Sequence, residues 1–370
     1  MRLFTFILLL LATTPVIGQK NYYLLVGTYT RGKSEGIYVY NFNKKDGSAK
    51  IVDSVQTSNP SYLAVAPNQK FVYAVQENAN NGKGGEVAAF AFTKENGKLS
   101  FINRQLSAGD HPCYVAIDKT GKWIAVANYT SGTVAVLPVN SDGSLGKAVS
   151  SFQHTGHGIN LKRQEGPHAH SAVFSPDNKY LFVQDLGIDK IIVYAFNDKT
   201  GALAQKDSIR LTDGSGPRHF TFHPNGKRAY VVQELSGDIT AFNYQKGALT
   251  QVQTISALPK NFNKFFTSAD IHVSNDGKFL YASTRDSANI LTIFRIDQKT
   301  GKLSIVGHQS VLGKTPRNFN FDPSGNYLLV ANQNSDNIVI FKVNRQTGLL
   351  TDTGNRIDVG SPVCIKWIEK

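Results

Sequence analysis

The sequence predicts an all-β fold, a seven-bladed β-propeller with four antiparallel strands in each blade. Two observations predict it: a turn motif that recurs seven times, and two chain ends that complete each other. The motif is Gly-x-Leu or Gly-x-Ala, at Gly47, Gly97, Gly143, Gly201, Gly247, Gly301 and Gly348. Its spacing of 46 to 58 residues is typical of repeat architectures, in which each repeat is one supersecondary unit.

Each repeat contains four strand-like segments. The first begins near a proline and alternates apolar residues, as in residues 60–65, 112–117, 217–222 and 316–321. The second is more apolar, the third opens near Gly or Asn, and the fourth is more polar, as expected at an outer edge. β-Branched and aromatic residues dominate, turn signals follow about every ten residues, and no useful window shows helical periodicity.

The two ends of the chain each supply part of one repeat. Residues 22–57 provide strands two to four, and residues 362–368 provide only a first strand. Pairing them closes the ring and removes exposed sheet edges. A β-sandwich does not need this split, and no linker-like stretch divides the chain into two domains. We therefore expect one propeller domain over residues 19–370, and a monomer.

Residues 1–18 are interpreted as a secretory signal peptide. Arg2 precedes the apolar run 4–12, which is too short to span a bilayer, since about 20 residues are needed. A buried N-terminal strand and a retained anchor are the alternatives. After cleavage we expect a periplasmic or secreted protein with no stable membrane association.

The charge and the cysteines exclude two function classes. The net charge of +13 falls to +12 when Arg2 is removed, and many lysines occupy equivalent turns, which disperses the charge around a ring. The aromatic residues follow strand patterns and no basic stripe, so nucleic acid is not expected as a partner. Cys113 and Cys364 lie in different repeats, beyond disulfide reach, and are interpreted as free packed thiols rather than a disulfide framework.

Two rings of residues are expected around one end of the central channel, because the loops before strand one and after strand two emerge on the same face. The first-strand ring is Ser61, Cys113, His170, Arg218, Ala269, Arg317 and Val363, with Tyr62, Tyr114, Ser171, His219, Asp270, Asn318 and Cys364 beside it. The second-strand ring is Tyr29, Glu77, Tyr129, Leu186, Glu234, Arg285 and Gln333, preceded by Gln76, Asn128, Asp185, Gln233, Thr284 and Asn332. Insertions 154–166 and 257–267 open onto the same face. Unequal polar residues at equivalent repeat positions predict a functional site.

The side chains of these rings suit lactone chemistry. Arg218, Arg285 and Arg317 can converge on an anionic substrate, since guanidinium groups match carboxylate and phosphate oxygens. His170 is a candidate general base, and Glu234 a candidate to orient or activate water. Opening a lactone needs a base for water, donors for the developing oxyanion and an anchor for an anionic group.

Each assignment has a structural alternative. Arg218 and Glu234 can pair within one blade, His170 can be a hydrogen-bonded structural residue, and Arg317 can brace a neighbouring loop. Further candidate substrate contacts are His168, His219, Asn128 and Asp185, although His219 and Asp270 are equally suited to satisfying buried polar groups.

Metal binding is suggested only by His168 and His170, whose imidazoles share one face of a strand. No cysteine or carboxylate cluster stands nearby at ligand spacing, and three arginines disfavour a cation. We expect neither a metal nor a cofactor.

At these residues the chain resembles the seven-bladed propeller lactonases, which include bacterial 6-phosphogluconolactonase and the fungal carboxymuconate cyclases. The motifs lie at residues 163–171, 182–187, 216–220, 233–236, 268–272 and 316–319. The resemblance implies metal-free hydrolysis, or the reverse closure, of a carboxylated or phosphorylated sugar-type lactone. By motif, the residues that do this work are His170, Arg218, Arg285 and Glu234.

The export signal departs from the cytoplasmic setting of the archetypal phosphogluconolactonase. An exported enzyme would rarely meet 6-phosphogluconolactone, so the resemblance supports the type of reaction better than it supports a phosphorylated substrate. An unphosphorylated aldonolactone is therefore an open possibility. The alternatives are an exported propeller that binds a ligand without catalysis, and a muconate-type cycloisomerase.

Overall fold

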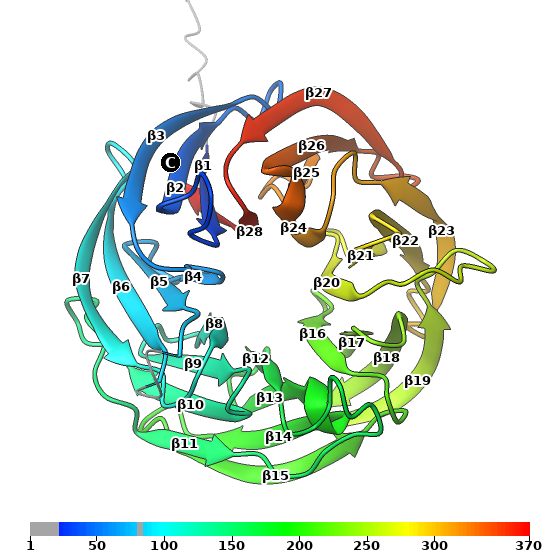
Figure 1. Cartoon of the computed structure of the whole chain (residues 1–370), viewed down its shortest axis with the longest axis horizontal. Coiled ribbons are helices and arrows are strands. Elements are labelled where there is room, and N and C mark those ends of the chain that lie inside the picture. Colours follow the sequence, from blue (N-terminus) through cyan, green and yellow to red (C-terminus); the bar gives the residue numbers. More distant parts are fainter. Residues whose placement is uncertain (1–21, 80–83) are drawn as a thin grey trace, which may run out of the picture.

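Seven four-stranded antiparallel sheets surround a central axis in the computed structural model, which describes residues 22–79 and 84–370 (Figure 1). The proposed signal peptide, residues 1–18, lies outside the described residues. Apart from strands, these residues form the 3₁₀ turns η2 (Leu186–Ile188) and η3 (Gln333–Ser335). None of the helical segments in this part of the chain has the length and apolar character needed to cross a membrane.

In six blades the four strands are consecutive and run outwards from the channel. Blade 1 contains β4 (Leu63–Val65), β5 (Phe71–Gln76), β6 (Glu86–Thr93) and β7 (Lys98–Leu106), and blade 2 contains β8 (Pro112–Ile117), β9 (Trp123–Asn128), β10 (Thr133–Pro138) and β11 (Ser150–Gln153). Blade 3 contains β12 (Ala169–Phe174), β13 (Tyr180–Asp185), β14 (Lys190–Phe196) and β15 (Leu203–Arg210). Blade 4 contains β16 (Pro217–Phe222), β17 (Arg228–Gln233), β18 (Asp238–Gln245) and β19 (Ala248–Ser256). Blade 5 contains β20 (Ser268–Val273), β21 (Phe279–Thr284), β22 (Ile290–Ile296) and β23 (Leu303–Ser310), and blade 6 contains β24 (Pro316–Phe321), β25 (Tyr327–Asn332), β26 (Asn337–Val343) and β27 (Leu350–Asp358).

Blade 7 joins the two ends of the sequence. Its order is β28 (Pro362–Glu369), β1 (Tyr22–Thr28), β2 (Gly36–Phe42) and β3 (Ala49–Gln56). The antiparallel pairing of β1 with β28 places Leu24 opposite Trp367. The predicted fold and its ring closure are therefore confirmed.

The recurring glycine has a structural cause that all seven repeats share. Each of these glycines has a positive φ, between 72° and 85°, which only glycine adopts readily. A Cβ at each position would also lie within 2.8 Å of a side chain in the preceding blade, at or next to the start of its second strand. The glycine thus allows both the turn and the close packing of neighbouring blades, which explains why the motif marks the repeat so clearly.

Burial decreases from the channel outwards. The second strands are almost completely buried, and β9 and β17 are buried at every position, whereas outer strands such as β15 are mostly exposed. Aromatic rings fill the space between blades: Phe182 of blade 3 stacks on Phe220 of blade 4, with 5.6 Å between ring centroids. This rigid packing holds the ends of the inner strands in fixed positions around the channel.

A β-bulge lies at the start of the first strand in most blades. In β12, Ala169 pairs with Asp185 and Ser171 with Gln184, which leaves His170 as the extra residue. Cys113, Arg218 and Arg317 are skipped in the same way in β8, β16 and β24. Bulges re-aim side chains beside functional sites, and here they present members of the first-strand ring.

Blade 1 differs from the prediction, because β4 begins at Leu63 rather than at residue 60. A tight turn precedes it: Asn59 has a φ of 43°, and its carbonyl accepts a hydrogen bond of 2.7 Å from the amide of Ser61. This turn keeps Ser61 out of the ladder.

Candidate active site

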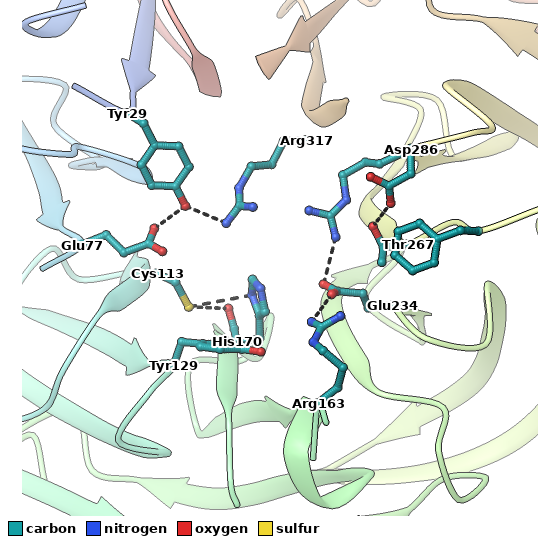
Figure 2. Close-up of a pocket in the computed structure, with 12 residues that line it drawn as sticks. Tyr29, Glu77, Cys113, Tyr129, Arg163, His170, Glu234, Thr267, Asp286 and Arg317 are labelled. Carbon is teal, nitrogen blue, oxygen red and sulfur yellow. Dashed lines mark hydrogen bonds and ion pairs between the residues drawn. The ribbon is translucent and has the colours of Figure 1, made fainter. Parts of the chain in front are cut away.

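A pocket of about 390 Å³ lies where the two rings meet (Figure 2). Eight of its lining residues belong to the predicted rings: Tyr29, Glu77, Cys113, Tyr129, His170, Glu234, Arg285 and Arg317. The others are Arg163, Phe265, Thr267 and Asp286, the first three from the two predicted insertions. The structure therefore brings His170, Glu234, Arg285 and Arg317 together, as the sequence predicted.

Glu234 is surrounded by three guanidinium groups. Its Oε1 accepts from Nη2 of Arg163 at 2.5 Å, and its Oε2 accepts from Nε of Arg218 at 2.8 Å and lies 3.1 Å from Nη2 of Arg285. Burial raises the pKa of Glu234, but Arg285, Arg218 and Arg163 outweigh burial and lower it to about 2. A carboxylate with such a low pKa is a poor base for water. Its contacts with three guanidinium groups instead suit Glu234 to positioning the arginines.

Arg218 lies beneath the pocket and does not line it. Its side chain is 1% exposed, and besides Glu234 it donates from Nη1 to the carbonyl of Ala269 at 2.6 Å. The structural pairing of Arg218 with Glu234, one of the two alternatives above, is what the structure shows.

Arg285 and Arg317 face the pocket from blades 5 and 6. Nη2 of Arg285 donates to the carbonyl of Ser268 at 3.2 Å, while its buried Nε has no partner among the described residues. Nη2 of Arg317 donates to the hydroxyl of Tyr29 at 2.8 Å. Burial lowers the pKa of Arg285 to about 10, so both guanidinium groups carry a positive charge at neutral pH.

His170 lies on the pocket floor, 5% exposed, with Tyr129 and His219 edge-to-face against its ring. Its Nδ1 is 3.8 Å from the thiol sulfur of Cys113, and among the described residues its Nε2 has no hydrogen-bond partner. Burial, and then the charge of Arg218, lower the pKa of His170 well below its usual value. The imidazole is therefore neutral at neutral pH and able to accept a proton.

A second polar cluster, formed by Tyr29 and Glu77, lies on the side of His170 away from Glu234 in Figure 2. Tyr29 donates from its hydroxyl to Oε2 of Glu77 at 2.8 Å, and Ser61 donates to the same oxygen. Burial raises the pKa of Tyr29, so its hydroxyl keeps its proton. Glu77 and Tyr29 were in the predicted ring but had no role assigned. Their contact was foreseeable, since they occupy equivalent positions in adjacent blades.

His168 and Asn128, two predicted substrate contacts, do not line the pocket. The ring of His168 stacks on Tyr129 at 4.4 Å, with Nδ1 3.0 Å from the Tyr129 carbonyl and Nε2 3.2 Å from Glu165. Asn128 donates to the carbonyl of Ser107 and to the hydroxyl of Thr133, both at 2.9 Å. His168 thus packs against Tyr129, which lines the pocket, whereas Asn128 ties β9 to β10 and to the segment after β7.

Asp185 and His219 are likewise engaged away from the pocket. Asp185 lies 2.6 Å from Nδ1 of His154 and accepts from the amide of His168 at 2.7 Å. His219 lies one residue beyond the bulge of β16, and its Nδ1 is 2.7 Å from Oδ1 of Asp270. The expectation that His219 and Asp270 satisfy buried polar groups agrees with this geometry.

Arg163 reaches the pocket from insertion 154–166 and was not among the predicted site residues. Buried Gln164 fixes the insertion by donating to the carbonyl of Leu186 at 2.9 Å and to Asp189 at 2.8 Å. Arg163 itself is 35% exposed along its side chain. The predicted opening of this insertion onto the channel face was the signal that could have identified it.

No group of three or more potential metal-ligating residues occurs in residues 22–79 and 84–370. The ring of His168 stacks on Tyr129, whereas the ring of His170 meets it edge-to-face. Cys113 and Cys364 are free, buried thiols, as the sequence predicted.

The fold and the site together are those of a seven-bladed propeller with a basic, histidine-bearing pocket. The chain belongs to the family described as lactonase, 7-bladed beta-propeller, which matches residues 23–367, and it is a lactonase. It is 39% identical to a 6-phosphogluconolactonase of Bacillus subtilis (strain 168), over 93% of this chain and 98% of the relative. It is 42% identical to a 6-phosphogluconolactonase of Formosa agariphila, over 88% of this chain and 94% of that relative. The solved periplasmic gluconolactonase of Pseudomonas aeruginosa is 39% identical, with a TM-score of 0.89 over 94% of this chain and 99% of that one.

Proposed function

We propose that this lactonase hydrolyses a sugar-type lactone, with His170 as general base and without a metal. The observation that supports it most is the buried imidazole of His170, which lines the same pocket as three arginines and whose Nε2 has no hydrogen-bond partner among the described residues. A histidine is unprotonated near pH 7 when its pKa is lowered, and in that form it can accept a proton from water.

The reaction follows from the side chains that face the pocket. His170 takes a proton from water as the water oxygen bonds to the lactone carbonyl carbon, and the carbonyl oxygen becomes an oxyanion. Arg285 and Arg317 stabilise that charge and hold an anionic group where the substrate has one. As the ring C–O bond breaks, the protonated imidazole returns the proton to the leaving alkoxide. Glu234 keeps Arg163, Arg218 and Arg285 in place throughout.

The substrate and its location are part of the proposal. The similarity to a periplasmic gluconolactonase and the leader-like residues 1–18 support export to the periplasm or beyond the cell. An exported enzyme meets unphosphorylated aldonolactones more readily than a cytoplasmic phosphorylated intermediate. An unphosphorylated sugar lactone is therefore the substrate we propose.

The test is ring opening of δ-gluconolactone and its 6-phospho form by the mature chain, measured above spontaneous hydrolysis, with and without chelator. We expect chelator-resistant acceleration by the wild type and by His157→Ala, an exposed histidine on the same face, and none by His170→Ala. Activity that survives His170→Ala would contradict the role of His170. Absence of acceleration on either lactone would favour a binding propeller, and closure of a muconate-type diacid would identify a cycloisomerase.

A further inference from the structure

Glu77 is a carboxylate with one oxygen fixed and one oxygen free. Its Oε2 accepts hydrogen bonds from the hydroxyls of Tyr29 and Ser61, whereas its Oε1 has no partner among the described residues. No lysine, arginine or histidine of the described residues forms an ion pair with Glu77. The hydroxyl of Tyr29 bridges Glu77 and Arg317, because it donates to Glu77 and accepts from Nη2 of Arg317.

Two of the three carboxylates that line the pocket, Glu77 and Glu234, have different surroundings. Both oxygens of Glu234 are taken by arginines, but Glu77 lines the pocket with Oε1 available to a ligand. Figure 2 shows the two on opposite sides of His170. Glu77 thus offers a carboxylate acceptor on the side of His170 that lies away from Glu234.

We propose that Glu77 is the specificity residue that accepts hydrogen bonds from the hydroxyl groups of the substrate, so that the site selects polyhydroxylated lactones. The inference rests on the proposed function and narrows its substrate class. Tyr29 and Ser61 keep the carboxylate in one orientation, which lowers the entropy lost when a hydroxyl binds. A hydroxyl donating to an ionised carboxylate forms one of the stronger protein hydrogen bonds.

The same carboxylate discriminates against diacids. A substrate with a second carboxylate on this side of the pocket would place like charges together, with no donor on Glu77 to compensate. A neutral sugar ring instead presents hydroxyl donors. Glu77 therefore favours sugar lactones over muconate-type diacids, which the arginines alone would attract more strongly than a neutral lactone.

The test compares two carboxylates of equal length, D-gluconate and hexanoate, which differ in their hydroxyl groups. Calorimetry on the full mature chain should show that the wild type binds gluconate at least about tenfold more tightly than hexanoate. In Glu77→Ala this ratio should fall to about one, and in Glu77→Gln, which keeps one acceptor, it should lie between. Glu95→Ala, an exposed carboxylate in the β6–β7 turn of the same blade, should keep the wild-type ratio.

Kinetics give an independent readout. For δ-gluconolactone, Glu77→Ala should raise KM about tenfold with kcat changed less than threefold, because recognition is lost and the base is retained. A wild-type chain without gluconate preference, an unchanged ratio in Glu77→Ala, or a loss confined to kcat would overturn the proposal. Failure of the proposed lactone hydrolysis shows differently: no lactone is opened, while the binding ratio still responds to Glu77.

Discussion

Nε of Arg218 donates a 2.8 Å hydrogen bond to Oε2 of Glu234, and both side chains are almost completely buried. Water cannot replace either partner at this depth, so each residue fixes the protonation state of the other. Glu234 also lies against Arg163 and Arg285, two of the three arginines that line the pocket. One buried carboxylate thus links the stability of blade 4 to the arrangement of the catalytic pocket.

Removing the charge of Glu234 should therefore destabilise the fold as well as impair catalysis. In Glu234→Gln three guanidinium groups lose their common countercharge, and breaking a buried pair in this way costs about 3–5 kcal/mol. We expect a fall of this size in the free energy of unfolding in urea, with Glu95→Gln at the exposed turn as the unaffected control. A loss of less than about 1 kcal/mol would show that the arginines do not need Glu234.

The pH dependence of kcat/KM should show that the base titrates unusually low. Burial and Arg218 lower the pKa of His170, and a general base is active only when unprotonated. Enzymatic kcat/KM, corrected for spontaneous hydrolysis, should stay level as pH falls from 8 through 6.5 and decline only well below that. An acid limb centred at pH 6.5 or higher would mean that the imidazole is solvated or that another base acts.

Acid should destabilise the fold through His219. Burial and Arg218 lower the pKa of His219 to about 4, although Asp270 acts to raise it. In the unfolded chain the pKa of this histidine is near 6.5. The unfolded state therefore gains a proton first, so stability is complete above pH 6.5 and is lost as pH falls towards 4. The loss amounts to about 3 kcal/mol.

The matched variant is His219→Asn, which keeps a donor for Asp270 but does not titrate. Its unfolding free energy should depend less on pH between 6.5 and 4 than that of the wild type. Part of the slope should persist because His170 titrates in the same direction. Identical slopes in the two proteins would show that His219 is protonated in the folded state.

Arg163 should distinguish phosphorylated from neutral substrates. It is the most exposed of the arginines around Glu234 and reaches in from insertion 154–166, where a phosphate on the substrate can meet it. We expect Arg163→Gln to reduce kcat/KM for 6-phosphogluconolactone about tenfold more than for δ-gluconolactone. Equal losses on both lactones would mean that Arg163 acts only through Glu234, and Arg163→Lys should retain part of the discrimination.

The sequence predicted the ring and most of the pocket because both depend on the repeat. Once strands one and two are aligned across blades, His170, Arg285, Arg317 and Glu234 necessarily converge on the channel. The alignment of the strands does not predict the direction in which each side chain points. A β-bulge adds one residue without a distinct sequence pattern, and it is the bulge that turns His170 towards the pocket while His219 lies deeper.

The remaining differences concern contacts between blades. Arg218 was predicted either to face an anionic substrate or to pair with Glu234, and the contact of its Nη1 with the carbonyl of Ala269 in the next blade was not foreseen. Arg163 comes from an irregular insertion whose path depends on buried partners such as Gln164. Long side chains and irregular loops are set by three-dimensional neighbours, and the pattern along the chain does not contain that information.

The pairing of β1 with β28 also has a consequence for biosynthesis. Every residue that lines the pocket is translated before β28, yet Tyr29 reaches Arg317 only from a blade that β28 completes. The chain thus carries every pocket residue while the ring is still open. Activity should appear only when β28 docks onto β1, so its recovery during refolding serves as a clock for the final step of folding.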